Sequence, residues 1–362
     1  MGRVDYETNP FASDETSKIL ASSKADSTEL KLLYSNNIQG EIGTCGCAFS
    51  PVGGVDRRLN YLNSLQGASS DFVHLDSGSA LFSTLVLTAN TKKKQRAVAE
   101  AIAQAYSMLS LSALNVGRYD LVEGHEFYMA QMKKHKLPSI STNLIDRNSK
   151  HPFPTSKTIK TKSGVTLKIL GFSSVSREII PGLELRPENP MEALARETKG
   201  LAKDVLLVVL SDLSSIENEE MTDNMDRPFL ILGSTSFDSF AYPLHKKTAA
   251  IGQTVAQGQE IGVLDVFWPK NGEGRWLNQS GLTSFNQRWE RLKQEREFLL
   301  NQEESEFLEE EKSRNQEAFV SLQKYAPVSS RQHIVYQAKL VTMDKNWTKK
   351  NKLSSLVKRH KK

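Results

Sequence analysis

The sequence predicts an α/β protein in which sheets and helices form layers. Apolar segments of strand length alternate with amphipathic segments over about 240 residues, from residue 30 to residue 266. Two of these segments, residues 205–210 (VLLVVL) and 229–233 (FLILG), are continuously apolar. Such runs are typical of strands that are covered on both faces. A chain of 362 residues with 38% hydrophobic residues is long enough to bury one large core.

Strand-like and helix-like segments alternate more regularly in the front half of the chain than in the second half. Residues 95–109 show the clearest helical spacing of apolar residues, with Val98, Ile102 and Tyr106 on one face. We expect strands at 30–33, 72–75, 113–116 and 139–144, and helices at 57–66, 95–109 and 124–136.

The second half repeats this alternation less densely and ends in a half-buried strand. We expect strands at 164–173, 205–210 and 229–233, a helix at 191–204, and strand segments around glycines at 249–266. Residues 333–343 place Ile334, Tyr336, Ala338 and Leu340 on one face, which favours a strand at the edge of a sheet.

Composition divides the chain into four parts. Residues 1–28 are polar and predict a disordered arm, and residues 29–270 form the layered domain. Residues 271–326 contain a long charged helix or helical hairpin over 285–325, whose apolar stripe is too irregular to define a coiled coil. This helix either packs on the body or binds a partner. Residues 327–362 hold the edge strand and a basic tail.

The net charge of +5 is concentrated at the C-terminal end. Residues 345–362 contain eight Lys or Arg and no acid, so the rest of the chain carries 5 − 8 = −3. This predicts a solvated terminal arm, and contact with an anionic surface is the alternative. Trp347 is the single aromatic residue of this tail, so nucleic acid is not favoured as a partner. No apolar stretch reaches the length of a membrane span.

The two cysteines, Cys45 and Cys47, lie in one C-G-C turn. They form no disulfide framework and have no zinc-site partners at the usual spacing. We interpret them as free thiols, with a redox or metal-binding thiol site as the alternative.

A polar turn follows the first strand and ends in the glycine pair Gly53 and Gly54. This turn resembles the first motif of the calcineurin-like metallophosphoesterases of the 5'-nucleotidase branch. Residues 253–265, with Gln253, Gly258 and Gly262, resemble the stretch that closes the catalytic domain of that family. The resemblance spans residues 30–266 in the family's order. It implies a four-layer αββα sandwich, a metal-dependent phosphoric ester hydrolase and an extracytoplasmic location. The chain as written carries no secretion signal, so that location implies a removed signal, and a cytoplasmic protein is the alternative.

The resemblance also implies a two-metal centre built from five loops, and here those loops carry other residues. The motif positions are occupied by Asn37 and Gln39, Ser79, Arg118 and Tyr119, Asp212, and Thr235 and Phe237. A shift of one residue in the last loop replaces the final pair with Ser234 and Ser236. No histidine remains in the set, and Asp212 is the acid that stands at a ligand position.

We therefore expect a catalytically inactive relative that binds or scaffolds a protein partner through the old active-site mouth or residues 285–325, and we predict no cofactor. We expect Arg118 to fill the vacated cation space, pairing with Asp212 or Asp120 or holding an anion. The alternative is a phosphoric ester or nucleotide hydrolase that binds a divalent metal pair through Asn37, Gln39, Asp212 and the thiols of Cys45 or Cys47.

Overall fold

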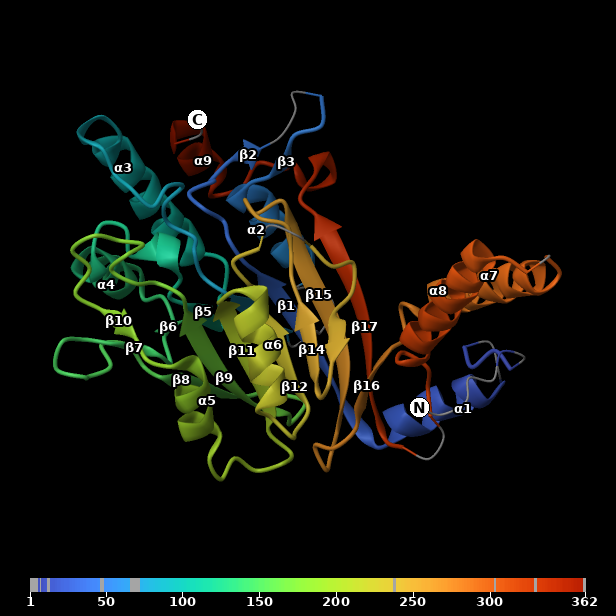
Figure 1. The fold of residues 1–362 in the computed structure, drawn as a ribbon. Helices are drawn as coiled ribbons and strands as arrows, with labels where there is room; N and C mark the ends of the chain where they lie inside the picture. Colours follow the sequence, from blue (N-terminus) through green and yellow to red (C-terminus); the bar gives the residue numbers. More distant parts are fainter. Residues whose placement is uncertain are drawn as a thin grey trace.

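Two β-sheets lie face to face in the centre of the molecule, and helices cover the outer side of each (Figure 1). The computed structural model describes residues 6, 8–11, 14–45, 49–65, 72–236, 239–302, 304–328 and 331–360. This arrangement confirms the predicted α/β sandwich of the metallophosphoesterase type.

The first sheet has the described strand order β16-β17-β15-β1-β4-β5-β6. Its strands β1, β4, β5 and β6 are mutually parallel, whereas β15 runs antiparallel to β1. The strands are β1 (Ser27–Ser35), β4 (Phe72–Asp76), β5 (Ala113–Asn115), β6 (Ser139–Ile140), β15 (Glu260–Pro269), β16 (Arg275–Asn278) and β17 (His333–Thr342).

The second sheet has the described order β13-β14-β12-β11-β9-β8. Strands β9, β11, β12 and β14 are parallel, and the edge strands β8 and β13 run antiparallel to their neighbours. The strands are β8 (Ser156–Lys160), β9 (Thr166–Ser173), β11 (Leu206–Asp212), β12 (Phe229–Leu232), β13 (Leu244–Lys246) and β14 (Ala249–Gly252).

The helices form the two outer layers and a projecting hairpin (Figure 1). They are α1 (Asp14–Ala25), α2 (Val55–Leu65), α3 (Ala89–Tyr106), α4 (His125–His135), α5 (Pro190–Thr198), α6 (Ser215–Asp223), α7 (Leu282–Leu300), α8 (Glu306–Gln323) and α9 (Ser354–His360). Two further pairs of short strands lie outside the two large sheets. Strand β2 (Thr44–Cys45) pairs with β3 (Val52–Gly53), and β7 (Leu144–Ile145) pairs with β10 (Arg186–Pro187). No described helix is both long enough and apolar enough to cross a membrane.

The continuous apolar run of β11 explains the layering. Val208 and Leu210 point into the core between the sheets, and Leu207 and Val209 point into the core under α5 and α6. Because both faces of the strand are covered, each of these side chains is fully buried. The prediction made from residues 205–210 is confirmed.

Polar residues fix where the outer helices begin. The side chain of Asn189 accepts hydrogen bonds from the backbone N–H groups of Met191 and Glu192 at the start of α5, where Pro190 occupies the first turn. Ser214 and Glu217 form a capping box at the start of α6. The sequence prediction missed α6, and it extended α5 to residue 204, past the actual end at Thr198.

The predicted disordered arm at residues 1–28 is wrong for its described part, because residues 14–25 form helix α1. Ile19 of this helix packs with Leu277 and Val335, and Phe11 packs 5.6 Å from Phe285 between ring centroids. Each partner lies more than two hundred residues away in the chain. Local periodicity could therefore not reveal this helix.

Residues 285–325 form a hairpin of two antiparallel helices, α7 and α8, and not one long helix. Trp289 and Phe319 meet edge to face at 4.8 Å between ring centroids near its base. The buried Asn315 donates to the backbone carbonyl of Leu292 at 3.0 Å. The hairpin therefore packs on itself, and it projects from the edge of the sandwich (Figure 1).

Two expectations for the C-terminal part are wrong. β17 is not an edge strand over its first half, because β16 pairs with residues 333–336 on the side opposite β15. The basic tail is not a free arm either, since Leu353, Leu356 and Val357 are buried in the core beneath α2 and α3. The basic residues of this segment predict a solvated arm, but these three apolar residues anchor it to the core.

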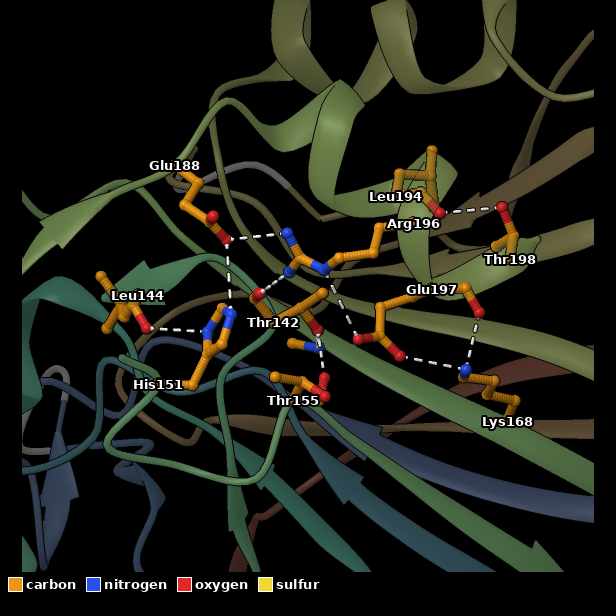
Figure 2. A network of polar contacts seen from close by, with 11 residues as sticks. Thr142, Leu144, His151, Thr155, Lys168, Glu188, Leu194, Arg196, Glu197 and Thr198 are labelled. Carbon is orange, nitrogen blue, oxygen red and sulfur yellow. Dashed lines mark hydrogen bonds and ion pairs between the residues drawn. The ribbon is translucent and has the colours of Figure 1, made fainter. Parts of the chain in front are cut away.

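A chain of polar contacts ties α5 to the second sheet (Figure 2). Arg196 pairs with Glu188 at 3.0 Å and donates to the backbone carbonyl of Thr142, also at 3.0 Å. The neighbouring Glu197 pairs with Lys168 of β9 at 3.0 Å. These contacts join α5 to the segment at Thr142 and to strand β9.

Replacing Arg196 with Gln is expected to lower the free energy of unfolding by about 1 kcal/mol, because the Thr142 carbonyl loses its charged donor. Arg314 of α8 also pairs with two glutamates, Glu310 and Glu311, but only within its own exposed helix. Arg314→Gln is expected to cost less than about 0.5 kcal/mol. Urea unfolding of both variants measures the difference, and equal losses would contradict this account.

Candidate functional site

The predicted site residues meet at the edge where the parallel strands of both sheets end. Asn37 follows β1, Ser79 follows β4, and Arg118 follows β5. From the second sheet, Asp212 ends β11 and Thr235 follows β12. The predicted positions therefore lie together at the carboxyl ends of the strands, which is where α/β folds place their ligands.

Backbone hydrogen bonds hold the first two loops together. The N–H of Asn37 donates to the carbonyl of Gly78 at 3.1 Å, and the N–H of Gln39 donates to the carbonyl of Ser79 at 3.0 Å. Asn37, Gln39 and Ser79 have φ angles of 53°, 51° and 59°. This left-handed conformation costs roughly 1–2 kcal/mol for ordinary residues. The surrounding contacts therefore impose the backbone shape at three of the motif positions.

Asp212 is the centre of the site. One carboxylate oxygen accepts from the hydroxyl of Ser79 at 2.7 Å, and the other accepts from the backbone N–H of Arg118 at 2.8 Å. The hydroxyl of Ser174, which sequence reasoning missed, contacts the second oxygen at 3.4 Å. Burial raises the pKa of Asp212 to about 6, and these donors partly oppose that rise.

Asp120 has a structural role beside the site. Its two oxygens accept backbone N–H groups from Gly117, Ser79, Ala80 and Leu81, at 2.8 to 3.0 Å. Burial raises the pKa of Asp120 to about 7, while the four N–H groups lower it. The carboxylate thereby ties the loop after β4 to the loop after β5.

The guanidinium of Arg118 crosses the mouth of the site. Its Nη2 donates to the backbone carbonyl of Thr235 at 3.4 Å, and its central carbon lies 5.5 Å from the ring centroid of Tyr119. Within the described residues it forms no ion pair with Asp212 or Asp120, so the predicted side-chain pairing is wrong. Arg118 reaches Asp212 through its backbone N–H, although its positive charge also lowers the pKa of that carboxyl.

Asn37 turns its amide toward the fifth loop. Its Nδ2 donates to the carbonyl of Ser234 at 2.8 Å and to the carbonyl of Ser236 at 3.4 Å. Gln253 binds the same two residues, accepting from the Ser234 hydroxyl at 2.6 Å and donating to the Ser236 carbonyl at 2.9 Å. The side-chain amide of Asn37 therefore holds the fifth loop in place.

The remaining predicted residues contribute less. The N–H of Tyr119 lies 3.4 Å from the Ser79 hydroxyl oxygen, and Nε2 of Gln39 is buried with no partner in the part of the chain that the structure describes. The thiol of Cys45 donates to the side-chain oxygen of Gln257 at 3.1 Å. Phe237 and Cys47 lie outside the described residues.

A buried ion pair that the sequence did not indicate lies below the site. Asp76, at the end of β4, accepts from the hydroxyls of Ser35 at 2.6 Å and Tyr106 at 3.1 Å. Nη1 of Arg58 lies 3.6 Å from the same carboxylate. Burial raises the pKa of Asp76, and the charge of Arg58 opposes this. The only sequence signal was an aspartate at the end of a buried strand.

These residues do not fit a pair of divalent cations. Across the described ranges, no group of three or more His, Cys, Asp or Glu side chains lies together. Asp212 gives both oxygens to internal donors, and Asn37 and Arg118 present N–H groups where cations need oxygen or imidazole ligands. The side chains of Asn37, Ser79 and Asp212 hydrogen-bond within the site, whereas Nε2 of Gln39 and Nε of Arg118 are buried without a partner in the described chain.

The pH dependence of folding is expected to report Asp212. The unfolded carboxyl ionises near its ordinary pKa of 3.8, whereas the folded one keeps its proton until about pH 6. Its contribution to stability is therefore complete below about pH 4 and is lost as the pH rises through 6. Relative to Asp212→Asn, the wild-type protein should lose up to about 3 kcal/mol of unfolding free energy between pH 4 and pH 7. Urea unfolding across this range tests the sign, and a constant difference would refute it.

Several solved structures share this fold. No protein-family model matches the chain, and no curated protein matches its sequence. The 5'-nucleotidase precursor of Thermus thermophilus superposes with a TM-score of 0.55 at 20% identity, over 68% of this chain and 52% of that one. The NAD nucleotidase NadN of Haemophilus influenzae gives 0.57 at 16% identity, over 68% and 49%.

The third is the calcineurin-like phosphoesterase YfkN of Bacillus subtilis, with a TM-score of 0.51 at 14% identity, over 68% of this chain and 87% of that one. The chain spans about half the length of the first two structures. These superpositions show that the chain has the metallophosphoesterase fold in the form found in 5'-nucleotidases.

Proposed function

We propose that this protein is a binding protein built on a hydrolase fold and that it does not hydrolyse phosphoric esters. The observation that supports this proposal best is the hydrogen bonding of Asp212. One of its oxygens accepts from the Ser79 hydroxyl and the other from the Arg118 backbone N–H. A dinuclear hydrolase needs free anionic ligands to hold two cations beside an attacking hydroxide. Here Asp212 is the sole carboxylate among the described motif positions, and each of its oxygens already accepts an internal hydrogen bond.

Charge supports the same proposal. Two divalent cations require several carboxylates or imidazoles around them, whereas Ser79 is neutral and Arg118 carries a permanent positive charge. The guanidinium lies close enough to lower the pKa of Asp212, so a cation at this carboxylate would meet a like charge.

The direct test is metal analysis combined with a phosphatase assay. After incubation with excess Mn²⁺ or Zn²⁺ and gel filtration, the wild-type protein should hold far less than one ion per chain. It should also fail to turn over p-nitrophenyl phosphate, bis(p-nitrophenyl) phosphate or AMP. A variant that restores ligands, Ser79→Asp with Arg118→Asn, should bind more metal than the wild type, because it adds a carboxylate and removes a cation.

Circular dichroism of both proteins controls for folding. Stoichiometric metal in the wild type, together with turnover that is abolished by a chelator and by Asp212→Asn, would overturn the proposal. That result would favour the alternative hydrolase.

The α7–α8 hairpin is the proposed contact surface for a protein partner. Its tip exposes Phe298, Leu300 and Phe307, at 65%, 58% and 70% of their surface. Between residues 295 and 311 the sequence has eight Glu and one Arg. Exposed aromatic side chains surrounded by acidic residues fit an apolar site that is bordered by Lys and Arg. The projection of the hairpin away from the sheets leaves this tip accessible (Figure 1).

Substitution of both tip phenylalanines, Phe298→Ser with Phe307→Ser, should abolish capture of a basic partner while the fold stays intact. The control is Ile216→Ser on α6, which removes an equally exposed apolar side chain, 73% accessible, far from the hairpin in sequence. Quantitative cross-linking mass spectrometry should show one protein cross-linked to the wild type and to Ile216→Ser but not to the tip variant. The same cross-linked proteins in all three samples would refute the role of the tip.

A further inference from the structure

A pocket lies at the end of the two sheets that is opposite the candidate site. It has a volume of about 600 Å³ and lies between the start of β16, the β13–β14 edge and the end of α8. The indole N–H of Trp276 donates to the carbonyl of Thr248 at 2.8 Å and so joins the two sheet edges at the pocket wall. The pocket is therefore bounded by fixed elements.

Positive charge dominates the lining. Lys247, Arg275, Lys324 and Arg331 line the pocket, and Glu273 is the one acid among the lining residues. Glu273 pairs with Lys203 at 2.6 Å and Lys247 pairs with Asp223 at 2.9 Å, so these charges are already neutralised.

Arg275, Lys324 and Arg331 have no carboxylate within ion-pair distance among the described residues. The two guanidiniums also act on each other. The pKa of Arg275 is lowered first by burial and then by the positive charge of Arg331. Like charges that face a shared cavity without a counter-ion are held at an electrostatic cost, which an anion in the cavity would remove.

Two buried polar atoms of the lining have no partner within the described chain. Nε2 of Gln332 is an unused donor, and Nδ1 of His245 is also without a partner. The hydroxyl of Tyr336 donates to the carbonyl of Pro243 at 3.2 Å, so Nε2 of His245, 2.8 Å from that hydroxyl, must carry the ring proton. Nδ1 of the neutral ring is then an acceptor. The pocket thus offers several donors, positive charge and one acceptor.

We propose that this pocket binds the phosphate group of a small phosphate monoester or of inorganic phosphate. A phosphate accepts hydrogen bonds from the guanidiniums of Arg275 and Arg331 and from the Gln332 amide. In its monoprotonated form it also donates one hydrogen bond, which matches the acceptor nitrogen of His245. Sulfate has the same shape but carries no proton at neutral pH. The volume leaves room for a small organic group beside the phosphate. The site is independent of the proposed function of the strand-end loops.

Isothermal titration calorimetry of the full chain with inorganic phosphate, glycerol 3-phosphate and sulfate tests the proposal. The wild type should bind both phosphates, and it should bind sulfate more weakly. Arg331→Gln, at an exposed position, should weaken phosphate binding about tenfold, because a charged donor is lost. Lys324→Gln provides a second variant.

Lys94→Gln on α3 is the matched control, since it removes one exposed positive charge at a distant position and should bind like the wild type. Thermal unfolding verifies that each variant is folded. Absence of phosphate binding by the wild type, or equal binding by Arg331→Gln, would overturn the site. Equal affinity for sulfate and phosphate would overturn the assignment to phosphate. Tighter binding of glycerol 3-phosphate than of inorganic phosphate would identify the monoester as the ligand.

Discussion

The buried carboxylate of Asp212 joins the two sheets at the candidate site through the hydrogen bonds that it accepts. Its partners Ser79 and Arg118 belong to loops of the first sheet, whereas Asp212 itself ends a strand of the second. A buried carboxylate without donors would destabilise the fold severely, so these two contacts are required wherever no cation is bound. The network closes the position where the family resemblance implies metal, and it does so with a hydroxyl and a backbone N–H.

The loop backbones keep their shape independently of the side chains that face the mouth. Backbone bonds link the Asn37–Gln39 turn to the loop after β4, and Asp120 binds four N–H groups around Ser79. Because these contacts use main-chain atoms and one buried acid, the residues at the mouth can change type while the frame stays. This separation explains how the fold can be shared with structures of at most 20% identity although the residues at the mouth differ in type.

The sequence predicts those features that arise from local patterns. Continuous apolar runs located β11 and β12, and strand-end positions located the cluster around Asp212, because parallel strands bring their carboxyl ends together. Helices α1 and α9 were missed since a few apolar residues, such as Ile19 and Leu356, find partners far along the chain. The contact of Arg118 with the Thr235 carbonyl depends on a side-chain rotamer, which no sequence pattern encodes.

The two charged regions of the molecule differ in how their charges are balanced, and this difference bears on where a ligand binds. At the strand ends, each oxygen of Asp212 accepts an internal hydrogen bond, and its negative charge lies near the positive charge of Arg118. In the pocket beside β16, Arg275 and Arg331 repel each other and have no acid partner within the described chain. A ligand gains free energy where it replaces an unfavourable arrangement and gains little where it replaces a satisfied one. The uncompensated charges therefore favour the pocket beside β16 as the place where we propose that an anion binds.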